Sequence, residues 1–192
     1  MRIGLNLLYL LPGQVGGTET YAVELMRALD SNSLDDEFIV FVNAESAALS
    51  VPVSHKFRRV ICPIRATSRV NRYLYEQFFL PFQLLWYRVD LLHSLGYVGP
   101  ILPLHRHLIT IHDANFVRLS HLMSPLKRIV YGLIARLSAK TCNLVVTDSN
   151  FSKGELEACL GLHESKLNVV LLGAPPFAVS YTHLTLPTKR IV

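Results

Sequence analysis

Short apolar runs alternate with segments of helical periodicity along almost the whole chain. The apolar runs have the length of buried strands and cover residues 2–10, 37–42, 58–64, 89–94, 107–113, 142–150 and 166–173. The helical segments between them cover residues 18–29, about 70–87, 126–139 and 153–161. We expect Pro81 to kink or divide the second of these helices. The alternation predicts an α/β fold, a Rossmann-like parallel sheet of six or seven strands with helices on both faces.

The composition fits one globular unit. Of 192 residues, 51% are hydrophobic, which is enough to bury one sizeable core. The three cysteines form no C-x-x-C pair, so they argue against a disulfide framework and a zinc ribbon and fit a reducing cytosol. No apolar run approaches the roughly 18 residues of a membrane-spanning helix. The apolar start resembles a short signal peptide, but Asn6 interrupts it, and we expect a buried first strand.

The net charge of +5 is unevenly distributed along the chain. Residues 1–55 hold two basic and seven acidic side chains, whereas residues 56–140 hold thirteen basic and three acidic ones. A basic middle that faces one way attracts the phosphates of a nucleic acid, an anionic lipid or a phosphorylated substrate. Ordinary solvated Lys and Arg explain the charge equally well. We expect no nucleic-acid partner, because no helix-turn-helix, zinc-finger or RNA-binding aromatic signature accompanies the charge.

Polar residues follow several of the predicted strands. In an open α/β sheet, ligands bind outside the carboxyl ends of the strands. At that edge the sequence places the glycine loop after the first strand and the residues His93, Ser94, Tyr97, His112, Asp113, Asp148, Ser149 and Asn150. Any Rossmann-like domain places loops there, yet so many polar side chains exceed what a core needs. The sequence therefore predicts a binding edge.

The loop "PGQVGG", residues 12–17, comes directly before the first predicted helix. The amides of the first turn of a helix have no partners inside the helix, and a glycine-rich approach lets an anion reach them. The loop contains neither G-x-G-x-x-G nor a following G-K-[ST], so neither dinucleotide binding nor a P-loop is supported. The alternative is that Gly16 and Gly17 only allow a tight turn and a close approach of the helix.

The eight histidines suggest a metal site, but their placement argues against one. His105 and His107 precede their predicted strand and should lie at its amino end, roughly 15–20 Å from His112. One zinc ion cannot join residues so far apart, so we expect no metal.

Four motifs occur together: "VGGTETYAVELMRAL", "DLLHSLGYVGP", "ITIHDANF" and "VVTDSNFSKGELEACLG…KLNVVLLG". In order and spacing they resemble the N-terminal half of the retaining GT-B glycosyltransferases of family 4. The stretch "RYLYEQFFLPFQLL" is most similar to the mannosyltransferase-type members that build polysaccharides and lipopolysaccharide. The resemblance covers Met1 to about Gly173.

The resemblance implies one half of a two-domain enzyme, with the acceptor bound by this N-terminal domain and most of the nucleotide-sugar donor bound by a C-terminal domain. It implies neither a metal nor a cofactor. Gly16 and Gly17 match the loop that approaches the sugar and diphosphate of the donor. His112 matches the family's histidine beside the reacting sugar and is the predicted catalytic residue. The residues predicted for the acceptor side are Thr18, Glu19, Arg72, Tyr97 and Asn115.

The resemblance also bears on mechanism and location. Retaining transfer in this family is thought to proceed on one face of the sugar, with the departing diphosphate drawing the acceptor proton, so no protein base is expected. The implied acceptor is a glycan or a lipid-linked molecule. For a lipid-linked acceptor, the basic residues between 56 and 140 are expected to make a peripheral contact with an anionic membrane. Alternatively, the helix around residues 73–86 is simply core. The expected location is the cytoplasm, with peripheral contact at the inner face of the cell membrane.

The family pattern stops after Gly173, so we expect a domain over residues 1–173 and a truncated linker over residues 174–192. Residues Val179 to Thr188 match the translation of a transposon-end adapter used in DNA sequencing, and we expect the residues from about 179 onward not to be of biological origin. The expected consequence is an inactive fragment of a hexosyltransferase.

Two other functions stay open at this point. A nucleotide-sugar epimerase of the same architecture also begins with a Rossmann-like half, but the glycine loop resembles the transferase loop better. A single-domain module that binds a phosphorylated ligand should be complete at this length. A half-enzyme, in contrast, should expose an apolar cleft wall and be poorly soluble.

Overall fold

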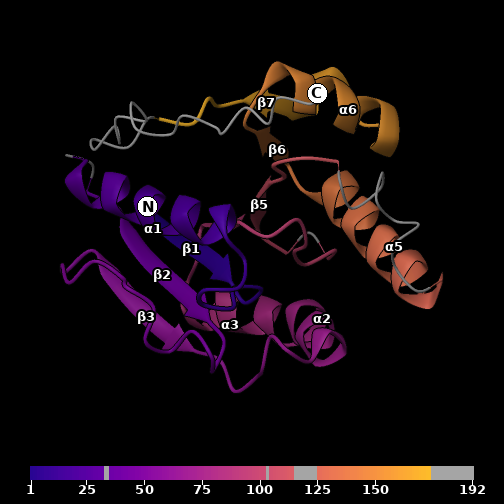
Figure 1. Cartoon of the computed structure of the whole chain (residues 1–192). Coiled ribbons are helices and arrows are strands. Elements are labelled where there is room, and N and C mark those ends of the chain that lie inside the picture. The colour runs from indigo at the N-terminus through magenta and orange to yellow at the C-terminus, as the bar shows by residue number, and fades with distance from the viewer. Residues whose placement is uncertain (33–34, 103, 115–124, 174–192) are drawn as a thin grey trace, which may run out of the picture.

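The computed structural model describes residues 1–32, 35–102, 104–114 and 125–173. Its strands form one seven-stranded parallel sheet in the order β3-β2-β1-β4-β5-β6-β7 (Figure 1). The strands are β1 (Arg2–Leu7), β2 (Glu37–Val42), β3 (Phe57–Ile61), β4 (Leu91–Ser94), β5 (Arg106–Thr110), β6 (Leu144–Thr147) and β7 (Leu167–Val169). The chain starts at the centre with β1, builds outward to β3, and then crosses to β4 on the other side of β1. The predicted Rossmann-like parallel sheet is confirmed.

Helices cover both faces of this sheet, as predicted. The described helices are α1 (Gly17–Ser31), α2 (Arg69–Phe78), α3 (Leu80–Trp86), α5 (Pro125–Thr141), α6 (Asn150–Leu160) and the short 3₁₀ helix η2 (Glu164–Lys166). Ala22 and Met26 of α1 pack on one side of β1 and β2, whereas Leu80 and Leu84 of α3 pack on the other. The side chains of α5 and α6 form a third core with β5, β6 and β7. Figure 1 shows α1 and the α2–α3 pair on opposite sides of the sheet.

The central strands are buried on both faces because helices lie on both. Along β2, Phe38 and Val40 point toward the α1 core, and Ile39 and Phe41 point toward the α3 core. In β1, a Cβ on Gly4 would lie 3.1 Å from Val89 and 3.4 Å from Leu84. The absence of a side chain at this position therefore lets α3 pack close to the centre of the sheet.

The predicted helix over residues 70–87 is divided, as expected from Pro81. Helix α2 ends at Phe78 and α3 begins at Leu80, with Pro81 in the first turn of α3, where its missing N–H removes no helical hydrogen bond. Other boundaries differ slightly from the expectation. The first strand ends at Leu7, and α6 begins at Asn150 because Ser149 caps it by accepting a 3.1 Å hydrogen bond from the Ser152 amide.

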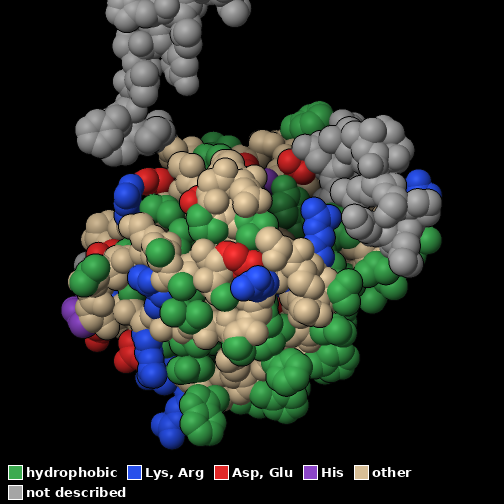
Figure 2. All heavy atoms as spheres, turned by 60° about the horizontal axis from the view of Figure 1, so that its bottom comes forward, with side chains coloured by type: hydrophobic (Ala, Val, Ile, Leu, Met, Phe, Trp, Pro, Cys, Tyr) green, Lys and Arg blue, Asp and Glu red, His purple; other side chains and the backbone are tan. Residues whose placement is uncertain are grey.

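Helix α2 is amphipathic in the reverse sense of an ordinary surface helix. Its buried residues are Arg72, Tyr73, Tyr75 and Glu76. The exposed large apolar side chains of α2, α3 and the residue between them are Val70, Leu74, Phe78, Phe79, Phe82, Leu85 and Trp86. We call these seven side chains the α2–α3 apolar face. Figure 2, which brings the α2 side of the molecule forward, shows a broad cluster of apolar side chains there.

Candidate functional site

The glycine loop and the start of α1 form a compact turn after β1. Gly13 and Gly16 have positive φ angles of 71° and 59°, which glycine adopts without steric cost. The Glu19 carboxylate accepts a 2.7 Å hydrogen bond from the Gly13 amide, and the Thr18 hydroxyl donates one of 3.0 Å to the Val15 carbonyl. These two side chains, predicted for the acceptor side, thus hold the shape of the loop.

Gly16 and Gly17 have different reasons to be glycine. The backbone of Gly16, with φ 59° and ψ −126°, lies in a region that other residues avoid. Gly17 lies inside α1 and has no positive φ, and a Cβ there would meet no atom within 4 Å among the described residues. The alternative of a tight turn therefore accounts for Gly16 but leaves Gly17 unexplained. Among the described residues no side-chain hydrogen bond caps α1, which begins at an exposed pair of glycines.

His112 and Asp148 meet at the carboxyl edge of the sheet. His112 follows β5 and Asp148 follows β6, and the pairing of these two neighbouring strands brings His112 Nδ1 within 2.7 Å of Asp148 Oδ2. The pair is mostly buried, with side-chain exposures of 12% and 19%. On the other side of the ring, His112 Nε2 is buried and has no hydrogen-bond partner among the described residues. Such an orphaned nitrogen is costly unless a ligand completes it.

Two tyrosines pack against the His112 ring. Tyr21 of α1 meets it edge-on, with ring centroids 4.8 Å apart, and Tyr97 lies 6.1 Å away. The Tyr21 contact brings the first turns of α1 next to His112. Burial raises the pKa of both phenols, so both hydroxyls remain protonated hydrogen-bonding groups at neutral pH. Tyr97 has a positive φ of 63°, a strained conformation for an aromatic residue at a candidate site.

A buried polar chain runs beneath this edge from α2 to β5. Asn6 at the end of β1 donates to Glu76 Oε1 at 3.4 Å and to Ser94 Oγ at 3.2 Å, and Ser94 Oγ lies 2.9 Å from His107 Nε2. The chain crosses the boundary between β1 and β4, where the strand order reverses. Burial lowers the pKa of His107 to about 3, so this histidine is a neutral hydrogen-bonding group.

Arg72, also predicted for the acceptor side, lies on the buried side of α2. Its guanidinium lies 4.6 Å above the ring of Tyr73, and its Nε is 3.9 Å from Glu76 Oε2. Tyr73 stacks in turn on Tyr131 of α5. These contacts place Arg72 among aromatic side chains between α2 and α5.

The described site residues form three groups, which are the glycine loop, the pair His112 and Tyr97, and Arg72 alone on the buried side of α2. Gly16, Gly17, Thr18 and Glu19 share one loop, and Tyr21 links the helix behind that loop to His112 and hence to Tyr97. The prediction for Asn115 lies outside the described residues. Sequence reasoning missed Tyr21 and Glu76 as parts of the site, and it placed Asp148 at the edge without pairing it with His112. The spacing of Tyr21, one helical turn after Gly17, was the available signal for its position.

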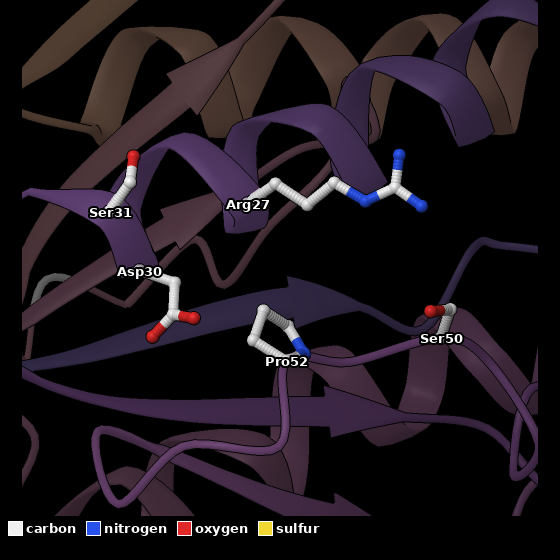
Figure 3. Close-up of a pocket in the computed structure, with 5 residues that line it drawn as sticks. All are labelled: Arg27, Asp30, Ser31, Ser50 and Pro52. Carbon is white, nitrogen blue, oxygen red and sulfur yellow. The ribbon is translucent and has the colours of Figure 1, made fainter.

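Three further observations bear on ligands. Within the described ranges, no group of three or more His, Cys, Asp or Glu residues is arranged to hold a metal ion. No helix in the described part of the chain is long and apolar enough to cross a membrane. A hollow of about 280 Å³ is lined by Arg27, Asp30 and Ser31 at the end of α1 and by Ser50 and Pro52 (Figure 3). Because it lies at the opposite end of α1 from Gly17, it is separate from the edge described above.

Comparison with known proteins bears on the fold and the family of the chain. No curated protein matches the chain. A solved sucrose-phosphate synthase from Thermosynechococcus elongatus is 12% identical, with a TM-score of 0.65 over 91% of this chain and 48% of that one. The lipopolysaccharide outer core galactosyltransferase WaaB in its apo form is 14% identical, with a TM-score of 0.56 over 93% of this chain and 48% of that one.

These likenesses show the fold of one half of a GT-B glycosyltransferase, and the chain spans about half the length of each of these two solved proteins. The family model Glycosyltransferase Family 4 matches residues 15–176, which is most of the chain. The chain therefore belongs to glycosyltransferase family 4.

Proposed function

We propose that this chain is the acceptor-side half of a retaining glycosyltransferase that moves a sugar, mannose by its sequence resemblance, from a nucleotide-sugar to a glycan or lipid-linked acceptor. The proposed pathway is polysaccharide or lipopolysaccharide biosynthesis. Membership of family 4 supports glycosyl transfer in general. The observation that carries the proposal further is Gly17, a glycine that the fold does not require and that lies at the uncapped start of a 15-residue helix.

The donor diphosphate fits the start of α1. The unpaired amides and the positive end of the helix dipole stabilise an anion placed there. A side chain at position 17 would project into space that is open among the described residues, and a diphosphate could occupy that space. In this proposal Gly16 shapes the turn and Gly17 leaves room for the donor, while Glu19 and Thr18 hold the loop.

His112 is the proposed residue beside the reacting sugar. When the carboxylate of Asp148 accepts the Nδ1–H of a neutral His112, the lone pair of Nε2 is left to accept a hydrogen bond from a sugar hydroxyl. Tyr97 and Tyr21 fix the ring from the sides. The proposal needs no protein base, because the departing diphosphate takes the acceptor proton. It also needs neither a metal nor a cofactor.

In this proposal the chain forms only the acceptor side of the active-site cleft, and the acceptor side alone cannot catalyse the transfer. The chain provides the loop, His112 and the proposed acceptor residues, while most donor contacts are proposed to come from a second domain. We therefore expect no turnover from these 192 residues and turnover from the complete gene product. Sequencing the gene across the codon for Ala178 tests the boundary, since a reading frame that continues into a second α/β domain is expected.

The function is tested with the complete gene product and a panel of nucleotide-sugars, by measuring release of nucleoside diphosphate and mass of the product. We expect a sugar to be transferred and Gly17→Ala to lower kcat/KM at least about tenfold without lowering Tm. Isomerisation of the nucleotide-sugar would instead support the epimerase. Binding without any turnover would support the single-domain binding module.

We also propose that the α2–α3 apolar face rests on the anionic inner surface of the cytoplasmic membrane. Trp86 and Phe82 of α3 are 83% and 68% exposed. The charged side chains Arg72 and Glu76 of α2 are buried on the opposite side. A cluster of seven exposed, large apolar side chains is typical of a binding surface. The only acidic residue within residues 69–88 is the buried Glu76, whereas Arg69 and Arg88 at its two ends are exposed. Apolar insertion framed by basic residues is the chemistry of an interfacial helix on anionic lipid.

The chain contains one tryptophan, Trp86, which reports directly on this surface. With vesicles of phosphatidylcholine and phosphatidylglycerol we expect its emission to shift to shorter wavelength, and with phosphatidylcholine alone we expect a much smaller shift. Phe82→Ser should weaken vesicle binding roughly tenfold by removing one inserted aromatic ring. The matched control is Phe151→Ser, which removes an equally exposed phenylalanine from α6.

Two outcomes would contradict the membrane proposal. An emission that does not change with anionic vesicles would mean that lipid does not cover this face. A shift that depends on protein concentration, with a dimer in sedimentation, would mean that a second copy of the chain covers it.

A further inference from the structure

Helix α2 buries an arginine and a glutamate that satisfy each other poorly. Arg72 is 9% exposed and Glu76 is 1% exposed. The distance from Arg72 Nε to Glu76 Oε2 is 3.9 Å, too long for a hydrogen bond, and neither atom has a hydrogen-bond partner among the described residues. A buried ion pair offsets its desolvation only with excellent geometry and further hydrogen bonds. The geometry of this pair is poor, and the facing atoms, Arg72 Nε and Glu76 Oε2, gain no further hydrogen bond within the described part of the chain.

The carboxylate is anchored, which fixes where the guanidinium can lie. Glu76 Oε1 accepts a 3.4 Å hydrogen bond from Asn6, which also donates to Ser94. Glu76 is thus tied to the carboxyl ends of β1 and β4. The order in which the chain adds strands to the sheet reverses between these two strands. Burial raises the pKa of Glu76 to about 7, so at neutral pH its charge neutralises Arg72 only in part.

The guanidinium of Arg72 lies over the Tyr73 ring, and its charge also reaches two other buried phenols, Tyr9 and Tyr131. The positive charge of Arg72 acts on the hydroxyls of Tyr9, Tyr73 and Tyr131, each of which burial keeps protonated by raising its pKa. Tyr9 donates to the Thr18 carbonyl at 3.3 Å, in the first turn of α1. A Cβ on Gly96 would lie 2.2 Å from the Tyr9 ring, so only glycine fits beneath it. Arg72 therefore lies near protonated phenols, one of which, Tyr9, contacts the start of α1.

We propose that Arg72 binds an anionic group of the acceptor, a phosphoryl or carboxylate group, and that Glu76 is the positioning residue that aims its guanidinium. This inference rests on the proposed function, because it assigns the acceptor class of the same site. An arginine held in place by the fold has already lost its hydration and its rotamer freedom, so an anion that presents two oxygens to the guanidinium binds at low further cost.

The test uses the 192-residue chain and two simple probes, methyl phosphate and acetate, which represent the two sources of the anion. Side-chain ¹H–¹⁵N spectra resolve arginine Nε–H groups, and the Arg72 signal is assigned by its loss in Arg72→Lys. We expect at least one probe to shift the Arg72 signal saturably. Arg72→Lys should weaken binding of that probe at least tenfold, since an ammonium lacks the planar fork. The probe that binds identifies the anion as phosphoryl or carboxylate.

Two further variants separate positioning from simple stabilisation. Glu76→Gln keeps the shape and the Asn6 contact but removes the charge, and we expect a several-fold change in probe affinity together with a moved Arg72 signal. Arg27→Gln, which removes an exposed arginine near the far end of α1, should leave the affinity unchanged. If neither probe shifts Arg72, or if Arg72→Lys binds as tightly as the natural chain, the pair is a structural ion pair and the proposal fails. Because this readout is binding alone, a failed transfer assay would not affect it.

Discussion

Tyr97 combines a strained backbone with a place beside His112. Its φ of 63° costs a side-chain-bearing residue about 1 kcal/mol, whereas glycine adopts it freely. Tyr97→Ala and Tyr97→Gly both remove the ring, so only the strain distinguishes them. We expect Tyr97→Ala to be less stable than Tyr97→Gly by about 1 kcal/mol in urea unfolding. Arg88, with φ 52° on the exposed surface, offers the same comparison away from the site, and equal stabilities at Tyr97 would show that no strain is held there.

The sequence was sufficient to place His112 and the glycine loop at one edge, because strand ends can be read from apolar runs. It could not pair His112 with Asp148, since that contact needs the order of β5 and β6 in the sheet. It could not separate Gly16 from Gly17 either, because φ and the surrounding space belong to the folded chain. Residue types at strand ends are thus predictable, whereas their partners are not.

Helix α6 begins at Asn150, two residues after Asp148, and its N-terminal cap is a single side chain. Ser149 accepts a hydrogen bond from the Ser152 amide, and the helix ends at Gly161 in the left-handed conformation. We expect Ser149→Ala to lower the free energy of unfolding by about 1 kcal/mol, measured by chemical denaturation. Ser149→Asp, which keeps a capping oxygen, should retain most of the stability. A variant Ser149→Ala as stable as the natural chain would mean that the cap contributes nothing.

Elements were predicted well where a local rule decides them and poorly where burial decides them. Pro81 predicts the break between α2 and α3 because its ring and missing N–H act locally. The reversed amphipathicity of α2 could not be predicted, since periodicity shows that a helix has two faces but not which of them turns inward. Arg72 and Glu76 on the inner face and Phe78 on the outer one became evident only in the fold.

At the scale of the whole molecule, two sets of buried groups give stability opposite dependences on pH. Burial, with a smaller contribution from a neighbouring histidine, lowers the pKa of His93 to about 4 and of His107 to about 3. The unfolded chain therefore takes up protons first, and stability falls as pH drops from about 6.5 through these values. Burial raises the pKa of Glu76 from 4.5 to about 7, with Arg72 and Asn6 opposing in part. Its stabilising contribution is present below about 4.5 and is lost as pH rises through about 7.

The two histidines outweigh the one carboxyl, so stability rises with pH between about 4.5 and 6.5 and is largest near neutrality. Urea unfolding at a series of pH values measures this curve directly. Glu76→Gln removes the titrating carboxyl that opposes the histidines, so the rise in stability between about pH 4.5 and 7 should become steeper. His93→Gln should make the same rise shallower, because it removes one of the two histidines that must charge on unfolding. A rise that is no steeper in Glu76→Gln than in the natural chain would show that the buried carboxyl does not oppose the histidines, and this carboxyl is the one proposed to position Arg72.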